Sequence, residues 1–521
     1  MSDSGDIATA VRLHPDDNVL CLLRDHRAGE IPQLPASDCA APLPSLLQAT
    51  PLGHKIALTE IVEGEPVLKY GVPIALARQR IQPGEHAHLH NLADLQDTAT
   101  RLSPAHAKQD PQATEPCSPA PIAASPDNTD GPYRLPSEFA GFQRSSGRPG
   151  IRNHLLILSV CGLNAAGARK VRAALPGSLL VSTAFGRGQL GADREFHDRM
   201  LRQLACHPNV GGVILLAADR HMRQRYQSVI TEQGRLCAGF SLQECGEDTV
   251  HLTELASVIG NEMQQQLASV RRQPCKTDTL AVAMECGHSD ASSGMVSNPL
   301  CGRLADELVH AGGTVVISET VEWSGAEQDL YQRCQTRRIA ERLQKLVIDR
   351  HEIARAAGRD LTLGNPGPQN HDGGITTLVE KSRGAIAKAG TTGIIAALAQ
   401  GELLPASAGL CLMDTPALSP ESISSMVASG AQLVLFTTGP GNPYGSAIAP
   451  TIKLSANPQT TRRVGHQIDF DASAAFDGRP SAGNLLPPLG ALLLRVCEGE
   501  SVAAERLDEG DEVISRLSAS V

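Results

Sequence analysis

The chain after Gly141 alternates short apolar runs with helical stretches, and this alternation constrains the fold more than any other feature of the sequence. The apolar runs are residues 154–160, 212–216, 279–283, 313–317, 408–413 and 432–436. Runs that are apolar throughout are typical of strands buried on both faces. With helices between them, such strands predict a parallel or mixed sheet covered on both sides, in two Rossmann-like α/β domains. In these sheets ligands collect beyond the carboxyl ends of the strands.

The N-terminal part has a different pattern of short strands and turns, for example Glu63-Gly64-Glu65-Pro66, which predicts a small β-rich domain. A last strand is expected over residues 86–90, where alternate histidines would share one face. The next residues are rich in Pro, Ala and Ser and predict a linker. At about 150 residues per domain, we divide the chain into a β domain (10–92), a linker (93–138) and two α/β domains (139–274 and 275–521).

Charge and composition exclude several classes of protein. A net charge of -10 and a pI of 5.9 argue against nucleic acid or an anionic membrane as a partner, but allow a small anionic substrate where Lys, Arg or a metal inverts the local field. No run of 18 apolar residues and no signal-peptide pattern is present, so we expect a cytoplasmic protein. The 13 cysteines include no CxxC pair, which argues against a zinc ribbon or a thioredoxin-type site.

Four polar segments follow predicted strands, and each has a functional and an ordinary interpretation. Thiol and carboxylate groups in the first two could hold a metal, whereas Gly, Thr and Lys in the last two could bind a carboxylate. The alternatives are an N-cap loop, a solvated helix start or a tight turn, and spacing alone does not decide between them. A Walker motif is absent, which argues against nucleotide binding. The segments are residues 285–294, 318–327, 365–382 and 436–445, the last with Lys453 downstream.

The small domain concentrates its polar side chains in His54-Lys55 and in His86, His88 and His90, which precede Asn91. A β core does not tolerate three imidazoles on one face without partners. This pattern favours metal ligation or base catalysis over a structural role for at least one of these histidines.

Taken together, these pieces resemble the altronate/galactarate dehydratase family, whose members carry an N-terminal SAF β domain and a longer α/β body. The resemblance covers nearly all of the chain except the linker. It rests on Gly53-His54-Lys55-Ile56-Ala57, on residues 84–92, on Gly141-Phe142-Gln143-Arg144 with residues 147–153, and on the four polar segments.

The resemblance implies a hydro-lyase that removes water from an aldonic or aldaric acid and gives a 2-keto-3-deoxy product. A β-elimination needs a base for the α proton, a cation for the enediolate charge and an acid for the departing hydroxyl. The implied cofactor is a divalent metal, Fe²⁺ first, with Mn²⁺, Mg²⁺ or Ca²⁺ as alternatives; a homo-oligomer is compatible with the sequence. The candidate residues are His54, His88 and Lys381 for catalysis; Lys55, Asn91, Ser289, Thr377, Thr438 and Lys453 for substrate; and Cys286, Asp290, Glu319 and His86 for metal.

The chain also departs from the family pattern. Cys161-Gly162, Gly186-Arg187-Gly188-Gln189 and Ala218-Asp219-Arg220 stand where the family typically has Gly-Cys, Gly-Cys-Ser-Gln and Gly-Cys-Glu, so a multi-cysteine iron site cannot be assembled as in the relatives. Cys286-Gly287-His288-Ser289-Asp290 and Pro440-Gly441-Asn442-Pro443 replace Cys-Gly-Gly-Ser-Asp and Arg-Gly-Thr-Pro. Three hypotheses therefore stay open: a sugar-acid dehydratase, a lyase of the same mechanism on another hydroxy acid such as sulfolactate, and a non-catalytic sugar-acid-binding paralogue.

Overall fold

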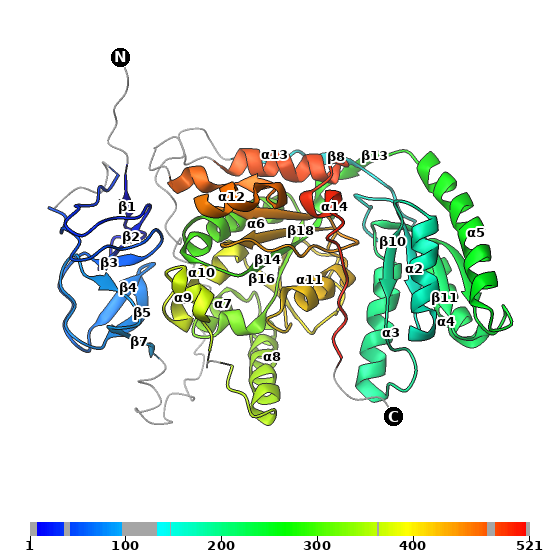
Figure 1. The fold of residues 1–521 in the computed structure, drawn as a ribbon, viewed down its shortest axis with the longest axis horizontal. Helices are drawn as coiled ribbons and strands as arrows, with labels where there is room; N and C mark the ends of the chain where they lie inside the picture. The colour runs from blue at the N-terminus through cyan, green and yellow to red at the C-terminus, as the bar shows by residue number, and fades with distance from the viewer. Residues whose placement is uncertain are drawn as a thin grey trace, which may run out of the picture.

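The computed structural model describes residues 8–35, 42–95, 133–145, 147–361, 364–476 and 485–516. These residues form three parts in a row (Figure 1): a β module (residues 8–95) at one end, a C-terminal domain (281–516) in the centre and a middle domain (154–269) at the other end. The predicted fold class, a small β domain followed by two α/β domains, is confirmed. Most of the predicted linker, residues 96–132, lies outside the described residues, and the domain boundaries stay predictions.

The β module is built from two small antiparallel sheets. One contains β1 (Ala10–Val11), β2 (Val19–Leu22), β3 (Lys55–Ala57) and β6 (His86–Ala87); the other contains β4 (Pro66–Lys69), β5 (Val72–Ala77) and β7 (Leu92–Ala93). The strand expected over residues 86–90 is wrong beyond Ala87. The chain turns there because the buried Asn91 accepts a hydrogen bond from the backbone N–H of His88 (2.9 Å) and donates to the carbonyl of His86 (3.0 Å).

The middle domain is a four-stranded parallel sheet with helices between its strands. The strand order is β10 (Leu179–Ser182), β9 (His154–Ser159), β11 (Val210–Ala217) and β12 (Leu236–Ser241). The helices are α2 (Ala165–Ala174), α3 (Gly191–Ala205), α4 (Arg220–Glu232) and α5 (Thr249–Ser269). β8 (Glu138–Gly141) and β13 (Gln273–Lys276), which flank this domain in the sequence, pair with each other in antiparallel fashion.

The C-terminal domain contains a seven-stranded parallel sheet. Its order is β16 (Ile394–Leu398), β17 (Gly409–Met413), β15 (Thr314–Ile317), β14 (Ala281–Gly287), β18 (Leu433–Thr438), β19 (Thr451–Ser455) and β20 (Phe470–Asp471). Around it lie α6 (Asn298–His310), α7 (Glu327–Arg333), α8 (Arg337–Ala356), α9 (Pro368–Asp372), α10 (Leu378–Ile386), α11 (Ser419–Ala428), α12 (Pro458–Val464), α13 (Leu486–Cys497) and α14 (Ala503–Arg506). Helix α6 continues directly from a π-helical stretch over Ser293–Ser297.

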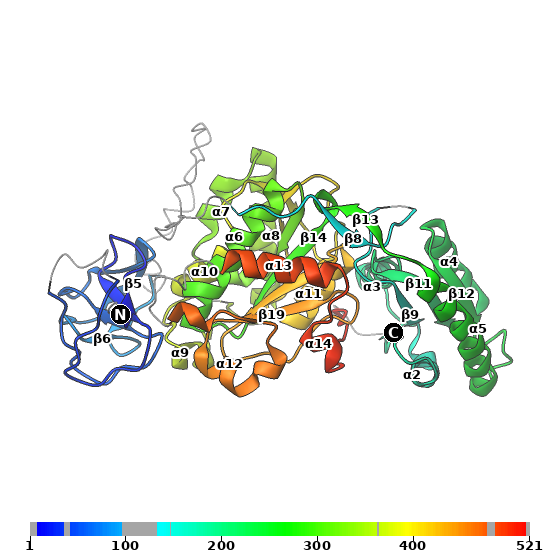
Figure 2. The same ribbon diagram turned by 90° about the horizontal axis from the view of Figure 1, so that it is seen from above.

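Strand β14 shows why the apolar runs predict buried strands. Val282 and Met284 point into a core shared with α6 and α13, whereas Ala281 and Ala283 point into a second core shared with α11 and with side chains of the middle domain. All seven residues of β14 are buried. Figure 2 shows α13 and α11 beside this sheet. Among the described residues, no helix combines the length and apolarity needed to cross a bilayer.

The contact between the middle and C-terminal domains makes stability depend on pH. His207 is fully buried; its Nε2 donates to the carbonyl of Ala431 (3.0 Å), and its Nδ1 accepts from the N–H of Asn209 (3.1 Å). Burial lowers the pKa of His207 to about 3. Its usual value of about 6.5 applies to the unfolded chain. Below pH 6.5 the unfolded chain therefore binds a proton that the folded protein does not, and stability is lost as the pH falls.

We expect His207 alone to reduce the free energy of unfolding by about 3 kcal/mol between pH 7 and pH 4. Denaturant unfolding at a series of pH values measures this slope. A His207→Gln variant should be less stable at pH 7 but should lose less stability on acidification. Parallel pH profiles for the two proteins would contradict the role assigned to His207.

Candidate functional site

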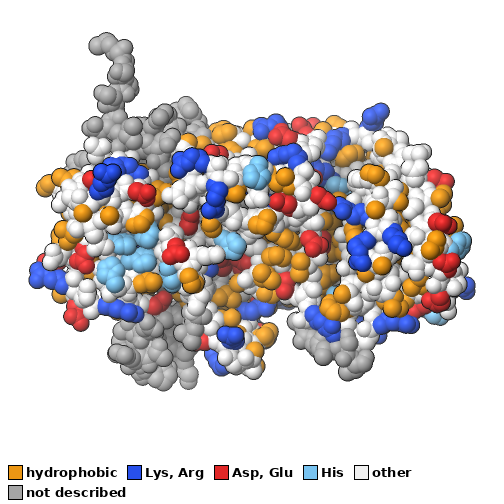
Figure 3. Space-filling view, in the orientation of Figure 1, with side chains coloured by type: hydrophobic (Ala, Val, Ile, Leu, Met, Phe, Trp, Pro, Cys, Tyr) orange, Lys and Arg blue, Asp and Glu red, His pale blue; other side chains and the backbone are white. Residues whose placement is uncertain are grey.

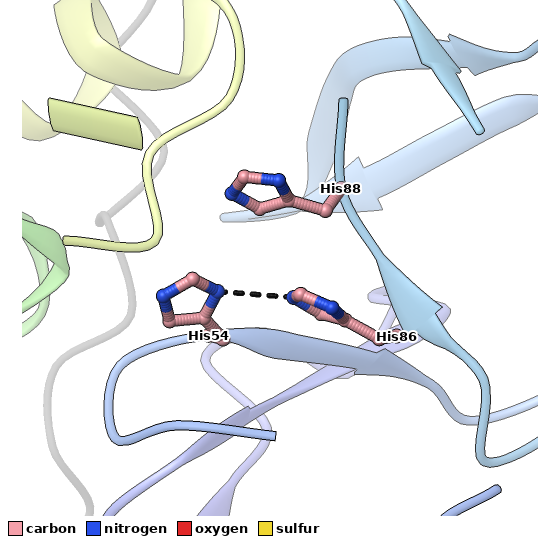
Figure 4. Close-up of side chains that lie close together, drawn as sticks. All are labelled: His54, His86 and His88. Atoms are coloured by element: carbon pink, nitrogen blue, oxygen red, sulfur yellow. Dashed lines mark hydrogen bonds between the residues drawn. The ribbon is translucent and has the colours of Figure 1, made fainter. Parts of the chain in front are cut away.

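Three imidazoles of the β module lie together at its interface with the C-terminal domain, which we call the seam. His54, His86 and His88 each offer a ring nitrogen, and these atoms lie within 4.8 Å of one another. His54 Nδ1 is 3.0 Å from His86 Nε2 (Figure 4). The rings of His54 and His88 stack with centroids 5.1 Å apart, and those of His86 and His88 with centroids 5.0 Å apart. Figure 3 shows histidine side chains gathered on this face of the β module.

The strand register explains why histidines from separate segments meet. β3 and β6 are antiparallel, with Lys55 opposite Ala87 and Ile56 opposite His86. One position further along this register, His54 faces His88. Gly53, with φ +80°, turns the chain into β3 just before His54. His90, in the turn that follows β6, remains near the group, with its ring centroid 5.9 Å from that of His86.

The C-terminal domain supplies hydrogen-bond acceptors to this group. His54 Nε2 lies 3.1 Å from the carbonyl oxygen of Asp372, and His88 Nε2 lies 3.1 Å from that of His371. Both carbonyls belong to the end of α9. A carbonyl oxygen only accepts hydrogen bonds, so both Nε2 atoms carry the proton. The lone pairs of His54 and His88 are therefore on their Nδ1 atoms.

The surroundings keep these rings neutral. Burial lowers the pKa of His54, and it lowers the pKa of His88 to about 4. Burial, together with the neighbouring His54 and His88, lowers the pKa of His86 to about 3. The Gln48 amide lies 3.3 Å from His86 Nδ1. At neutral pH the group therefore presents three uncharged imidazoles, the form in which histidine binds metal ions.

A buried ion cluster lies beside the histidines. The two carboxylate oxygens of Glu380 accept hydrogen bonds from Lys55 Nζ (2.9 Å) and Lys69 Nζ (2.8 Å). Burial by itself would raise the pKa of Glu380, but the two ammonium groups outweigh it and lower this pKa. Lys55, predicted to bind substrate, is 0% exposed. The structure therefore places Lys55 inside the interface between the β module and the C-terminal domain.

The residues predicted at the end of β14 lie in a separate network. Cys286 Sγ is 2.8 Å from Ser289 Oγ, and burial raises the pKa of this thiol. Asp290 accepts hydrogen bonds from Ser292 Oγ (2.6 Å) and Asn457 Nδ2 (2.7 Å). The structure thus does not bring Cys286, Asp290 and Glu319 to His86 as one ligand set. In the described parts of the chain, the group of three metal-binding side chains found together is His54, His86 and His88.

Glu319 belongs to a buried cluster of carboxylates, which also contains Glu285 and Glu322. Among these three, Glu319 is the only one that the sequence predicts as a metal ligand. It adopts φ +66° two residues after the end of β15 and contacts Glu285 of β14. Burial raises the pKa of both carboxyl groups, and the charge of Glu285 raises that of Glu319 further. Lys388 Nζ lies 3.2 Å from Glu322 Oε2. In the sequence, the only clue to Glu285 and Lys388 was that each is a charged residue within an apolar run.

Lys381 connects this cluster of carboxylates with the loop before α9. Its Nζ donates to Asn365 Oδ1 (2.7 Å) and lies 3.6 Å from Glu322 Oε1. Asn365 also lines a cavity of about 260 Å³ between the β module and the C-terminal domain. The other residues that line this cavity are Arg78, Leu89, Leu92, Asp94, Gly364, Pro366, His371, Thr376 and Thr377.

The remaining predicted substrate-binding residues make contacts within the fold. Thr377 caps α10, accepts from the N–H of Glu380 (3.3 Å) and donates to the carbonyl of Ile74 (2.6 Å). Thr438 accepts from the N–H of Gly441 (3.1 Å). Lys453 donates to the carbonyl of Pro443 (2.7 Å) and to Glu509 (2.8 Å). Asn91 organises the turn after β6. The roles assigned to these residues stay predictions.

The structure thus consists of a β module and an α/β body that meet at three imidazoles. Three family models cover the chain: the altronate/galactarate dehydratase SAF domain (residues 8–95), the D-galactarate dehydratase/altronate hydrolase second domain (141–280) and the D-galactarate/altronate dehydratase C-terminal domain (277–520). The chain belongs to the altronate/galactarate dehydratase family and is a hydro-lyase.

Relatives with curated names agree with this membership. Altronate dehydratase of Escherichia coli is 31% identical over 516 residues, which cover 96% of this chain and 97% of the relative. Galactarate dehydratase (L-threo-forming) of E. coli is 26% identical over 524 residues, covering 94% and 93%. The (2R)-sulfolactate sulfo-lyase subunit beta of Chromohalobacter salexigens is 33% identical over 388 residues, covering 73% and 98%.

Proposed function

We propose that this chain dehydrates a small anionic sugar acid, an aldonate or aldarate such as altronate or galactarate, to a 2-keto-3-deoxy acid. The observation that carries this proposal is the meeting of three neutral imidazoles with the C-terminal domain at the seam. The names of the relatives supply the class of substrate. The cytoplasmic location and a homo-oligomer are proposed from the sequence alone.

We further propose that His54, His86 and His88 hold a divalent metal ion. Their residue type and neutral state suit Fe²⁺ or Mn²⁺ better than Mg²⁺ or Ca²⁺, because the latter two prefer oxygen ligands. When bound, such a cation stabilises the negative charge that develops on the substrate's carboxylate. A nitrogen that binds a metal has no lone pair left for a proton. The proposed role in metal binding therefore replaces the sequence-based assignment of His54 and His88 to proton transfer.

Proton transfer then falls to other groups at the seam. The reaction breaks the C2–H and C3–O bonds, releases water and leaves an enol that becomes the 2-keto-3-deoxy acid. His371 Nδ1 faces the carbonyl of Ile375 (2.9 Å), which makes Nδ1 the protonated nitrogen and leaves a lone pair on Nε2. We propose that His371, which lines the 260 Å³ cavity, accepts the C2 proton. We propose that Lys381 donates to the departing hydroxyl.

The direct test is turnover with a panel of aldonates and aldarates. Protein freshly purified and supplied in turn with Fe²⁺, Mn²⁺, Mg²⁺ and Ca²⁺ should form a 2-keto-3-deoxy acid from at least one substrate, and activity should disappear on chelation. Product formation is followed by mass spectrometry as a loss of one water. Silence across the whole panel with every metal would overturn the proposal.

A second candidate function is elimination of sulfite from a sulfonated hydroxy acid. The 33% identity to the sulfolactate lyase subunit favours it. Its first step is the same removal of a proton next to the carboxylate, but the C3–S bond breaks instead of C3–O. Sulfite release from sulfolactate, without dehydration of any sugar acid, would select this function over the first.

A further inference from the structure

The carboxylate of Glu380 accepts four hydrogen bonds, two of which join the C-terminal domain to the β module. Its carboxylate accepts from Lys55 and Lys69 of the β module, and its Oε2 also accepts from the N–H and the hydroxyl of Thr376, each at 2.8 Å. The Glu380 side chain is 1% exposed, and so is that of Lys69. A carboxylate in this position holds two buried ammonium groups that would otherwise repel each other without a counter-charge.

The same contacts fix the segment that faces the histidines. Lys55 Nζ also donates to the carbonyl of Gly374 (3.0 Å), and Lys55 directly follows His54 in β3. Gly374 and Thr376 continue the segment whose carbonyls at His371 and Asp372 accept from the imidazoles. Holding both Lys55 and Thr376, Glu380 therefore sets the distance between the imidazoles and their carbonyl acceptors.

That distance determines which ring nitrogens can bind a ligand. While the carbonyls of His371 and Asp372 remain in reach, His88 and His54 keep their protons on Nε2 and their lone pairs on Nδ1. Without these acceptors, the proton can move between the two nitrogens of each ring. Groups that bind the far side of a histidine orient the ring and choose its tautomer in the same way in metal sites.

We propose that Glu380 is a positioning residue for the imidazole site: by holding Lys55, Lys69 and Thr376 together, it keeps the Nε2–H tautomer of His54 and His88. This inference deepens the proposed function, on which it rests for the use of the site. It gives Lys55 a role in positioning instead of the predicted contact with substrate. It also makes the C-terminal domain part of the metal site without supplying a ligand.

The first test reads the tautomers directly in the full-length protein without metal. Long-range ¹H–¹⁵N spectra of protein labelled in histidine distinguish Nε2–H from Nδ1–H rings, and His54→Ala and His88→Ala variants assign the signals. We expect both residues to be Nε2–H tautomers in the unaltered protein and mixtures of the two forms in Glu380→Gln. A merely structural role for Glu380 would lower stability and leave the tautomers unchanged.

The second test uses Co²⁺ alone as the probe and measures its affinity by calorimetry and by its visible absorption. Removal of a group that orients a metal ligand typically weakens affinity about 10–100-fold, and we expect a loss of this size in Glu380→Gln. Thr376→Val keeps both ion pairs and should lose only a few-fold, which covers the case in which Glu380→Gln fails to fold. Glu505→Gln is the control, because it removes the charge of a partly exposed carboxylate that pairs with the largely buried Arg152, away from the seam.

The outcomes separate this inference from the proposed function. Nε2–H tautomers that change in Glu380→Gln but not in Glu505→Gln support the positioning role, even if no substrate is turned over. Nδ1–H rings in the unaltered protein overturn it. So does a Glu380→Gln or Thr376→Val protein that keeps both the tautomers and the Co²⁺ affinity of the unaltered chain. Correct tautomers without Co²⁺ binding would count against the proposed metal and not against Glu380.

Discussion

The His88→Ala variant is expected to lose both bound metal and turnover while its fold remains intact. His88 contributes one of the three ring nitrogens that lie within 4.8 Å of one another, and two imidazoles cannot replace three. Its ring is partly exposed at the seam, so its removal leaves no large cavity in the core. Metal content after dialysis, turnover on the best substrate and circular dichroism measure the three parts of this expectation. We expect turnover to fall below detection.

Two further variants identify the cause of that loss. His90→Ala removes a neighbouring exposed imidazole, 5.9 Å from His86, and should keep metal and activity. His371→Gln should lose turnover but keep the metal, because it alters the proposed base and leaves the backbone carbonyl that faces His88. If His88→Ala lost turnover with its full metal content, His88 would be a proton-transfer group, as the sequence first suggested. Unchanged turnover would remove it from the mechanism.

Gly374→Ala is expected to reduce turnover about 100-fold or more by separating the two halves of the site. Gly374 has φ +90°, and a Cβ atom there would lie 2.8 Å from the backbone oxygen of Gly53 and 3.2 Å from the nitrogen of His54. Backbone atoms cannot move aside as a flexible side chain can, so the seam must open. A displacement of about 1 Å is enough to cost about 100-fold in rate. Turnover and Co²⁺ affinity measure the effect.

Gly358→Ala is the matched control for this change. Gly358 also has a positive φ, +72°, but a Cβ atom there meets nothing within 4 Å. Both variants carry the backbone strain of a side chain in this conformation, about 1 kcal/mol. Only Gly374→Ala carries the clash at the seam. Equal turnover in the two variants would show that the close approach at Gly374 is not needed for activity.

The fold was predictable because its strands obey a simple rule. β9, β11, β14, β15, β17 and β18 are parallel strands buried on both faces, and their continuous apolar runs mark them in the sequence. β19 was missed, since Lys453 interrupts a run that is nevertheless fully buried. The lysine is accommodated because Glu509 and a backbone carbonyl bind its ammonium group. Such a partner, 56 positions away, has no signature in the local pattern.

The site was predictable only in part, for a similar reason. The sequence singled out His86 and His88 by their spacing, and also His54, and the structure brings these three side chains together. It could not show that the carbonyls of His371 and Asp372 would meet these rings, because a backbone carbonyl is present at every residue. The predicted ligands Cys286 and Asp290 make hydrogen bonds with Ser289 and Ser292 of their own loop and with Asn457, the N-cap of α12.

The ion cluster at the seam also has a consequence for inheritance. Lys69 and Glu380 are 311 positions apart, yet without Glu380 the buried ammonium groups of Lys55 and Lys69 would have no counter-charge. A mutation that removes the Glu380 carboxylate is therefore harmful until a second mutation removes a lysine charge from the β module. Across descendants of this protein the two positions should change together or not at all, so that the β module and the body are inherited as a matched pair.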